Sequence, residues 1–256
     1  MSHAEILKVQ CLTVRFGGLN AVDSVDFSLL DNEIVSLIGP NGAGKTTTFN
    51  AITGFVKKEA GTIEFKGNHL EHLRPHEIAE KGIVRTFQIT SLFPNLSVLD
   101  NIWVGRHMQE KGSLFDTLFN TRRKQRKEDT NFKKALEILK FIALDRVRNT
   151  IAFSLPYGDQ RVLEIGVALA AEPEVLLLDE PSAGLNDAET QVMMSLIKKL
   201  RDQGMTILLV EHDMKLVMGI SDRIMVLNFG KKITEGTPAE IRSDPEVIAA
   251  YLGERR

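Results

Sequence analysis

The strongest chemical signal in this sequence is the segment Gly39–Thr46, which reads GPNGAGKT and matches G-x-x-x-x-G-K-[ST] at every position. Gly42 and Gly44 allow backbone N–H groups to turn toward phosphate oxygens, and a helix that opens at Thr46 adds the positive end of its dipole. Lys45 can reach the β- and γ-phosphates, while the Thr46 hydroxyl can ligate Mg²⁺. We therefore predict a nucleotide-binding loop formed by Gly39, Asn41, Gly42, Ala43, Gly44, Lys45, Thr46 and Thr47.

Two adjacent carboxylates, Asp179 and Glu180, follow the apolar run Val175–Leu178. Neighbouring acids repel each other unless a cation or a proton is shared between them. Beside a phosphate loop, Asp179 can hold Mg²⁺ through water and Glu180 can act as general base toward an attacking water. The alternative, two solvated acids in a turn, is common for an isolated pair but is disfavoured next to a phosphate loop.

The elements that position these residues alternate between strands and helices. The apolar run Glu33–Ile38 leads into the phosphate loop, and residues 46–52 have helical character. Further apolar runs at 175–178, 206–210 and 224–227 are separated by helical stretches such as 188–200, which predicts a parallel sheet covered on both faces. Apolar residues in the first third alternate as in half-buried antiparallel strands, namely Leu7, Val9, Leu12, Val14, Val25, Phe27 and Leu29, with a further strand at 62–66.

Bulk properties narrow the class of protein. The chain has 256 residues, a net charge of −2, 43% hydrophobic residues and 26% charged residues, which is ordinary for a globular protein and gives no reason to expect nucleic acid as a ligand. The single cysteine, Cys11, excludes an intrachain disulfide and is typical of a reducing compartment. Neither a signal peptide nor an apolar run long enough to cross a bilayer is visible, so we expect a soluble chain that works at a membrane only by docking.

Four further segments occur in order along the chain, and with the first two motifs they resemble the motif set of the ABC ATPases: Arg85–Gln88, Ser154–Gln160, Ser182–Asn186 and Glu211–Asp213. The resemblance covers essentially the whole chain and implies ATP and Mg²⁺ as cofactors, with hydrolysis of ATP to ADP and phosphate. It also implies a P-loop NTPase of α/β class, with a mixed RecA-like core sheet, an antiparallel β subdomain and an inserted α-helical subdomain. We accordingly expect one ABC ATPase domain over 1–256, with a catalytic core at 1–90 and 170–256 and a helical signature subdomain at 91–169.

The same resemblance assigns roles to individual residues. Gln88 would contact Mg²⁺ and the attacking water, and its loop would sense a membrane partner. His212 would contact the γ-phosphate from the end of a neighbouring strand. Phe16 is the best match to the aromatic residue that stacks on adenine, although a core phenylalanine is an equally good interpretation, and Val22 would flank the base.

The signature motif departs from the family pattern. Leu155–Asp159 stands where the consensus is Leu-Ser-Gly-Gly-Gln, whose serine and glycines grip the nucleotide bound to the opposite subunit. Pro156 has neither a hydroxyl nor an N–H group, so it cannot make the contacts of that serine. Gly158 and the helix that follows it remain for this role. We therefore expect the composite site that uses this signature to be weakened, while the site built on the intact loop is competent when it meets a partner with a complete signature.

Within the family, several segments resemble the LivG-type ATPases of high-affinity branched-chain amino-acid importers: 16–22, 82–88, 157–165, 211–218, 251–254 and a helical insertion at 105–127. This branch implies a second ABC ATPase subunit in a heterodimer, two membrane permease subunits and, indirectly, a periplasmic binding protein. It also implies a peripheral location on the cytoplasmic face of the inner membrane.

Several alternatives stay open from the sequence. Importers for urea, short amides or other amino acids share these features. A soluble non-transport ABC ATPase is the second interpretation, and a lipopolysaccharide-export ATPase, with a similar tail, is the third. The basic run Arg122–Lys127 is either the solvated face of a helix, which we favour, or a contact with anionic lipid or an acidic loop. The tail 245–252 predicts a short amphipathic helix packed on the core.

Overall fold

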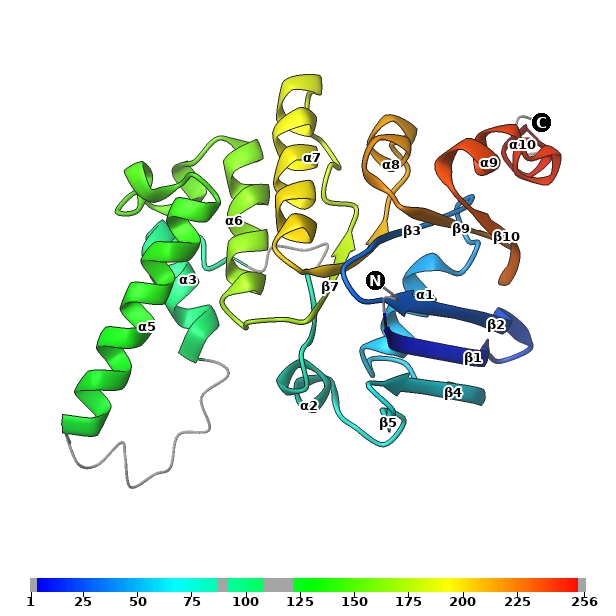
Figure 1. The fold of residues 1–256 in the computed structure, drawn as a ribbon, viewed down its shortest axis with the longest axis horizontal. Coiled ribbons are helices and arrows are strands. Elements are labelled where there is room, and N and C mark those ends of the chain that lie inside the picture. Colours follow the sequence, from blue (N-terminus) through cyan, green and yellow to red (C-terminus); the bar gives the residue numbers. More distant parts are fainter. Residues whose placement is uncertain (1–3, 87–91, 108–121, 253–256) are drawn as a thin grey trace. The chain divides into compact units, whose positions relative to one another are not determined.

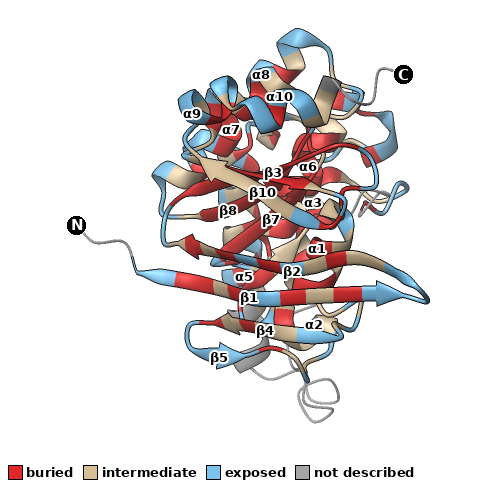
Figure 2. Ribbon diagram, turned by 90° about the vertical axis from the view of Figure 1, so that its right-hand side faces the viewer, coloured by how far each residue is buried: buried red, intermediate tan, exposed pale blue. Residues whose placement is uncertain are grey.

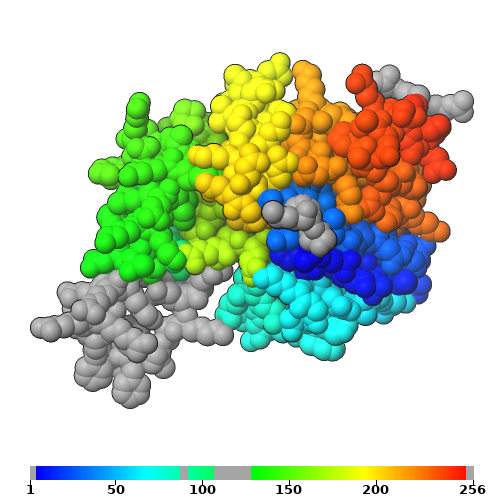
Figure 3. Space-filling view, in the orientation of Figure 1, coloured from blue at the N-terminus to red at the C-terminus, as the bar shows by residue number. Residues whose placement is uncertain are grey.

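The computed structural model describes residues 4–86, 92–107 and 122–252. The chain forms two units, which we call the core unit (Met1–Arg85 with Glu174–Arg256) and the helical unit (Thr86–Pro173). The core unit is assembled from segments far apart in the sequence, and the blue, cyan, orange and red surfaces of Figure 3 belong to one continuous body.

A six-stranded sheet in the order β10-β9-β3-β8-β7-β6 is the centre of the core unit. Its strands from β9 to β6 run parallel, and β10 pairs antiparallel with β9 at the edge. Every residue of β3, β8 and β7 is buried, so these three ribbons are red along their whole length in Figure 2. The strands are β3 (Ile34–Ile38), β6 (Ile83–Arg85), β7 (Val175–Asp179), β8 (Thr206–Val210), β9 (Arg223–Asn228) and β10 (Lys231–Gly236).

A second, antiparallel sheet of four strands has the order β2-β1-β4-β5. It comprises β1 (Glu5–Phe16), β2 (Leu19–Leu30), β4 (Ala60–Phe65) and β5 (Asn68–His69). The apolar residues expected to alternate along the first two strands are all buried, at 6% exposure or less. One face of this sheet therefore packs on the core, as the period-two pattern predicts.

The helices of the core unit cover the six-stranded sheet on both faces. Figure 1 shows α7 and α8 on one side of the strands, and α1 together with β1 and β2 on the other. Alternate residues of β9 divide between these layers: Met225 and Leu227 join the core cluster with Phe49 of α1, whereas Ile224 and Val226 pack with Val217 of α8. The helices are α1 (Lys45–Ile52), α2 (Pro75–Glu80), α7 (Asp187–Asp202), α8 (Met214–Ile220), α9 (Pro238–Ser243) and α10 (Pro245–Leu252).

The helical unit contains α3 (Val98–His107), α5 (Arg122–Phe141) and α6 (Tyr157–Leu169), which pack on one another. Ile102 of α3, Leu139 of α5 and Leu163 of α6 are fully buried. Ion pairs join α3 and α5 to the segment after α6. Arg106 Nη1 of α3 donates to Glu172 Oε1 at 2.9 Å, and Lys134 of α5 contacts the same carboxylate.

The structure confirms the fold class that the sequence predicts, a mixed parallel sheet with an antiparallel subdomain and added helices. The C-terminal segment 245–252 is a helix, and Val247 packs in the core beside α8 and α9. The basic run Arg122–Lys127 lies in α5, but its side chains are outside the described part of the structure. Whether they face solvent, anionic lipid or an acidic loop is therefore not tested. Among the described helices, none combines the length and the apolar character needed to cross a membrane.

The ion pairs of Glu172 predict a pH-dependent contribution to stability. Lys134 and Arg106 hold the pKa of the Glu172 carboxyl below its ordinary value of about 4.5. A lowered folded-state pKa contributes stability that is present above the ordinary pKa and is lost as pH falls through the lowered value. Glu172→Gln should lower the free energy of unfolding at pH 7 by roughly 0.5 kcal/mol, since this carboxylate is half-exposed. Denaturant titrations between pH 7 and pH 3 should show that difference disappear at the acid end; an equal difference at every pH would contradict the prediction.

Candidate functional site

The predicted phosphate loop connects β3 to α1, and close contacts require glycine at two of its positions. Gly39 has φ +149°, and a Cβ there would lie 2.1 Å from the Leu227 carbonyl oxygen. Gly44 caps α1 with φ +103°, and a Cβ there would lie 2.5 Å from the Ala21 carbonyl oxygen. Only glycine fits these two positions without displacing the backbone of β2 or β9.

The other residues of the loop are fixed by its own backbone and by the β9–β10 turn. Lys45 Nζ donates to the carbonyl oxygens of Gly39, at 2.6 Å, and Pro40, at 2.9 Å. Ala43 is buried, and its carbonyl oxygen accepts from Gly230 N at 3.1 Å. Asn41, Gly42 and Thr46 are exposed and Thr47 is half-buried. The loop thus presents backbone and hydroxyl groups to solvent at the N-terminus of α1, where an anion is favoured.

The strand order brings the phosphate loop, Asp179, Glu180 and His212 to one edge of the six-stranded sheet, where the parallel strands end. Strand β8 lies between β3 and β7, with Val210 opposite both Leu37 and Asp179. The parallel strands end together, so the phosphate loop follows β3, Glu180 follows β7 and His212 follows β8 at the same edge. This is the edge at which open α/β sheets bind ligands.

Asp179 is buried and has an arginine partner that was not predicted from the sequence. Arg85 Nη2 donates to Asp179 Oδ2 at 2.5 Å, and Arg85 Nη1 donates to Asn50 Oδ1 at 2.5 Å. The Arg85 guanidinium also lies 5.5 Å from the ring centre of Phe49. Arg85 therefore joins the end of β6 to the carboxylate of β7 and to the helix that follows the phosphate loop.

The donors at this edge are suited to Mg²⁺ held mainly by phosphates and water. Asp179 supplies a carboxylate and Thr46 a hydroxyl, both hard oxygen ligands, and Mg²⁺ commonly uses one or two carboxylates together with nucleotide phosphates. In the described residues no three His, Cys, Asp or Glu side chains gather as a metal cluster. The residues present thus fit a nucleotide-bound Mg²⁺.

Glu180 and His212 lie close together. His212 Nδ1 is 3.9 Å from Glu180 Oε1, and the same nitrogen is 3.9 Å from Glu211 Oε2. The His212 side chain is 66% exposed and that of Glu180 is 27% exposed, so both can reach a molecule bound at this edge. The structure brings these two predicted catalytic residues together.

Phe16 and Val22 lie on the first hairpin and differ sharply in burial. Phe16 is 52% exposed and pairs with Leu19 at the hairpin end, so the interpretation of Phe16 as a core residue is wrong. Val22 is fully buried in the core cluster, with Cγ2 3.5 Å from the position of a Cβ on Gly44. Val22 thus packs beneath the phosphate loop, whereas the exposed ring of Phe16 is accessible to a ligand.

The remaining predicted residues lie outside the core unit or outside the described chain. Gln88 falls in residues 87–91, which the structure does not describe. In the helical unit, Pro156 is the N-cap of α6 and provides no side-chain hydrogen bond to it. Gly158 is buried in the first turn of the same helix.

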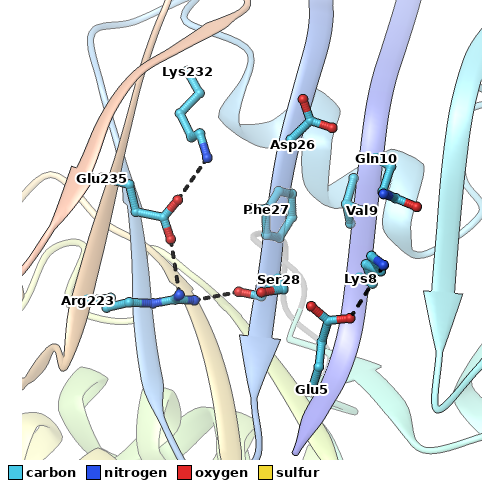
Figure 4. A pocket seen from close by; sticks show the side chains of 10 residues that line it. All are labelled: Glu5, Lys8, Val9, Gln10, Asp26, Phe27, Ser28, Arg223, Lys232 and Glu235. Atoms are coloured by element: carbon cyan, nitrogen blue, oxygen red, sulfur yellow. Dashed lines mark hydrogen bonds and ion pairs between the residues drawn. The ribbon is translucent and has the colours of Figure 1, made fainter.

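An open pocket of about 260 Å³ lies elsewhere on the core unit, lined by residues of β1, β2, β9 and β10 (Figure 4). Four of its five charged side chains besides Arg223 form ion pairs, since Glu235 contacts Arg223 and Lys232 and Glu5 contacts Lys8, while Asp26 accepts from Cys11 N at 2.7 Å. Arg223 also pairs with Glu33, where burial raises the pKa of the carboxyl while the Leu30 N–H group and Arg223 oppose the rise. Arg223 of β9 also donates to the Ser28 carbonyl oxygen of β2, a contact between the two sheets, and none of the predicted site residues lines the pocket.

Comparison with known proteins agrees with this geometry. Residues 22–183 match the family model described as ABC transporter, and residues 231–256 match the model described as branched-chain amino acid ATP-binding cassette transporter. The first match covers more than half of the chain. The chain therefore belongs to the ABC transporter ATP-binding family, and its activity is that of an ATPase.

Individual relatives and solved structures lead to the same family. The chain is 51% identical to the high-affinity branched-chain amino acid transport ATP-binding protein LivG of Escherichia coli K12, over 97% of this chain and 98% of that protein. It is 46% identical to the corresponding protein BraF of Pseudomonas aeruginosa, with the same coverage. A crystal structure of an ABC transporter cassette in its ADP conformation superposes with a TM-score of 0.86 at 32% identity, covering 98% of this chain and 99% of that chain.

The sequence motifs contain Arg85 and Glu211, two further residues at this edge, but predict no role for either. Both are charged and immediately follow or end an apolar strand, which is the signal that could have identified them. Their burial depends on which strands become neighbours, and no local pattern gives that order. Charged side chains are almost never buried unless they are paired, and both have partners in the protein: Asp179 for Arg85 and Ser182 for Glu211.

The contacts of Gly44 predict a local effect on nucleotide binding. Gly44→Ala would push a methyl group into the Ala21 carbonyl and displace the loop, so we expect the Kd for ATP to rise at least about tenfold. Isothermal titration with ATP measures this. Gly204→Ala is the matched control, because Gly204 has φ +95° and open space around it. The control variant should lose stability but keep the wild-type Kd; equal Kd values for both variants would contradict the prediction.

Proposed function

We propose that this chain is the ATP-hydrolysing subunit of an importer for branched-chain or related amino acids. The observation that carries the proposal is the match of residues 231–256 to the branched-chain family model, together with 51% identity to LivG over almost the whole of both chains. The generic ABC motifs support ATP hydrolysis but do not distinguish solutes, whereas this C-terminal segment and these relatives do.

Nucleotide binding is assigned to the phosphate loop. Backbone N–H groups of residues 41–47 and the N-terminus of α1 would surround the phosphates, with Lys45 neutralising charge on the β- and γ-phosphates. Thr46, Asp179 and Gln88 would hold Mg²⁺, which neutralises phosphate charge when bound. Phe16, exposed at the end of the hairpin, would stack on adenine, and the buried Val22 would support that side of the site.

Hydrolysis is assigned to Glu180 and His212, with Gln88 placing the water. A water attacks the γ-phosphorus, the bond from that phosphorus to the bridging oxygen breaks, and the proton of the water passes to Glu180 as general base. His212 donates to a γ-phosphate oxygen. Their 3.9 Å separation supports this division of roles, because both side chains then face the same small volume.

A second ATPase subunit would complete the site. The segment at the N-terminus of α6 in the helical unit, including Gly158, would meet the nucleotide held by the partner, and a partner signature would meet the nucleotide on Gly39–Thr46. We propose that the helical unit contains this signature subdomain, and that two membrane permease subunits and a periplasmic binding protein belong to the same transporter. The chain would then lie peripherally on the cytoplasmic face of the inner membrane.

Replacement of the proposed base tests the function directly. Glu180→Gln should keep ATP binding, since the phosphate loop is untouched, but lower ATP hydrolysis at least about 100-fold, the usual contribution of a general base. Uptake of radiolabelled leucine by cells that carry this variant as their only copy should be lost. Glu174→Gln, a change just before the other end of β7, should leave both activities near wild type. Normal leucine uptake in a strain lacking this chain would reject branched-chain import.

A second test concerns Pro156, the N-cap of α6, which stands where the signature consensus has serine. Pro156→Ser supplies a hydroxyl and an N–H group where the structure shows no side-chain cap, so the helix should gain about 1 kcal/mol and the weakened composite site should be restored in part. ATPase of the assembled complex should rise. Pro156→Ala is the matched control, because it supplies the N–H group without the hydroxyl. An unchanged rate for Pro156→Ser would contradict the proposal that the signature is weakened.

A further inference from the structure

The buried carboxylate of Glu211, which has no assigned role in hydrolysis, contacts the turn that contains Glu180 and the backbone of His212. Glu211 follows β8 directly, and its side chain has no exposed surface. Burial of a charged group is costly unless hydrogen bonds compensate for the lost water. The partners of Glu211 are therefore informative about its role.

Four protein donors surround the Glu211 carboxylate, two on each oxygen. Oε1 accepts from Ser182 N at 2.8 Å and from Ser182 Oγ at 2.6 Å. Oε2 accepts from His212 N at 2.9 Å and from Asp213 N at 3.3 Å. A single side chain thus joins the segment after β7 to the segment after β8.

The first of these segments positions Glu180. Glu180 has φ +47°, a left-handed conformation that costs a residue with a side chain roughly 1–2 kcal/mol. Its N–H group donates to the Val210 carbonyl at 2.8 Å, and its own carbonyl accepts from Ala183 N at 3.1 Å. Ser182 lies within this turn, so its two hydrogen bonds to Glu211 help to hold a conformation that the chain would not otherwise favour.

The second segment positions His212. The His212 N–H group donates to Oε2 of the same carboxylate that holds Ser182. The imidazole is mostly exposed, so its position depends on the backbone that carries it. Its Nδ1 lies 3.9 Å from both Glu180 Oε1 and Glu211 Oε2. Displacement of the Glu211 carboxylate would therefore change the distance between His212 and Glu180.

We propose that Glu211 is a positioning residue for ATP hydrolysis, which fixes Glu180 and His212 relative to each other through one buried carboxylate. It acts through these residues and does not touch the nucleotide. The inference rests on the proposed catalytic roles of Glu180 and His212, but it is independent of the transported solute.

The pairing of donors makes the proposal testable by a nearly isosteric change. The glutamine side chain in Glu211→Gln has one oxygen and one NH₂ group, whereas each of the two Glu211 oxygens that they replace accepts from at least one backbone N–H group. If the NH₂ group faces Ser182, the serine hydroxyl can turn to accept, but Ser182 N loses its acceptor. If it faces His212, two backbone N–H groups lose theirs. In either orientation of the amide, at least one of the two segments loses a backbone hydrogen bond to residue 211.

The test measures kcat and KM for MgATP in the assembled complex, and Kd for ATP on the chain. We expect Glu211→Gln to lower kcat by roughly tenfold or more, as small displacements of catalytic groups do, with Kd within about twofold of wild type. Ser182→Ala, which removes only the hydroxyl donor, should lower kcat less, and Ser182→Thr, which retains it, should restore the rate. The double variant should lose less than the product of the two single losses, because both changes act on one contact.

Glu33→Gln is the matched control, because Glu33 is also a buried glutamate but lies at the opposite end of β3. Its kcat should remain at the wild-type value even if its melting temperature falls. A wild-type kcat for folded Glu211→Gln, or an equal loss in Glu33→Gln, would overturn the proposal. If Glu211→Gln does not fold, a wild-type kcat for Ser182→Ala overturns it. Absence of ATPase in the wild-type complex would instead reject the proposed function.

Discussion

The order of the parallel strands is the constraint on which the candidate site depends. Residues separated by most of the chain meet because β8 lies between β3 and β7, so that three strands end at one edge. The core that enforces this order is mostly apolar, with every residue of β3, β7 and β8 buried. Packing of α1 and the antiparallel sheet on one face, and of α8–α10 on the other, leaves the strand ends to carry the predicted polar residues.

Charged side chains at that edge are held by partners inside the protein. Arg85 binds Asp179 and Asn50, and thereby links the last residue of β6 to the proposed Mg²⁺ ligand and to α1. Glu211 performs a similar task for the turn after Glu180 and for His212. Preorganised polar groups of this kind stabilise a reacting charge without rearrangement during the reaction, which is the general source of electrostatic catalysis. The strain at Glu180 is consistent with a turn fixed by its surroundings.

Local patterns in the sequence were sufficient for the phosphate loop, the alternating strands and the C-terminal helix, because each is encoded by residues close together in the chain. Burial of Arg85 and Glu211 was not predictable in this way, since it follows from strand neighbours distant in sequence. Phe16 shows the same limit: an aromatic residue at the end of a hairpin is core or surface depending on what packs over it, and it is exposed. The positions of Gly39 and Gly44 against Leu227 and Ala21 likewise required the assembled fold.

The most direct measurement is a structure of the complete transporter with Mg²⁺ and a non-hydrolysable ATP analogue. The γ-phosphate is predicted to lie between Lys45 and His212 of this chain, with the Glu180 carboxylate facing it and Ser182 still bonded to Glu211. The signature helix nearest that phosphate should belong to the second ATPase subunit. A nucleotide whose phosphates lie away from Gly39–Thr46, or a γ-phosphate that neither Glu180 nor His212 can approach, would contradict the proposed site.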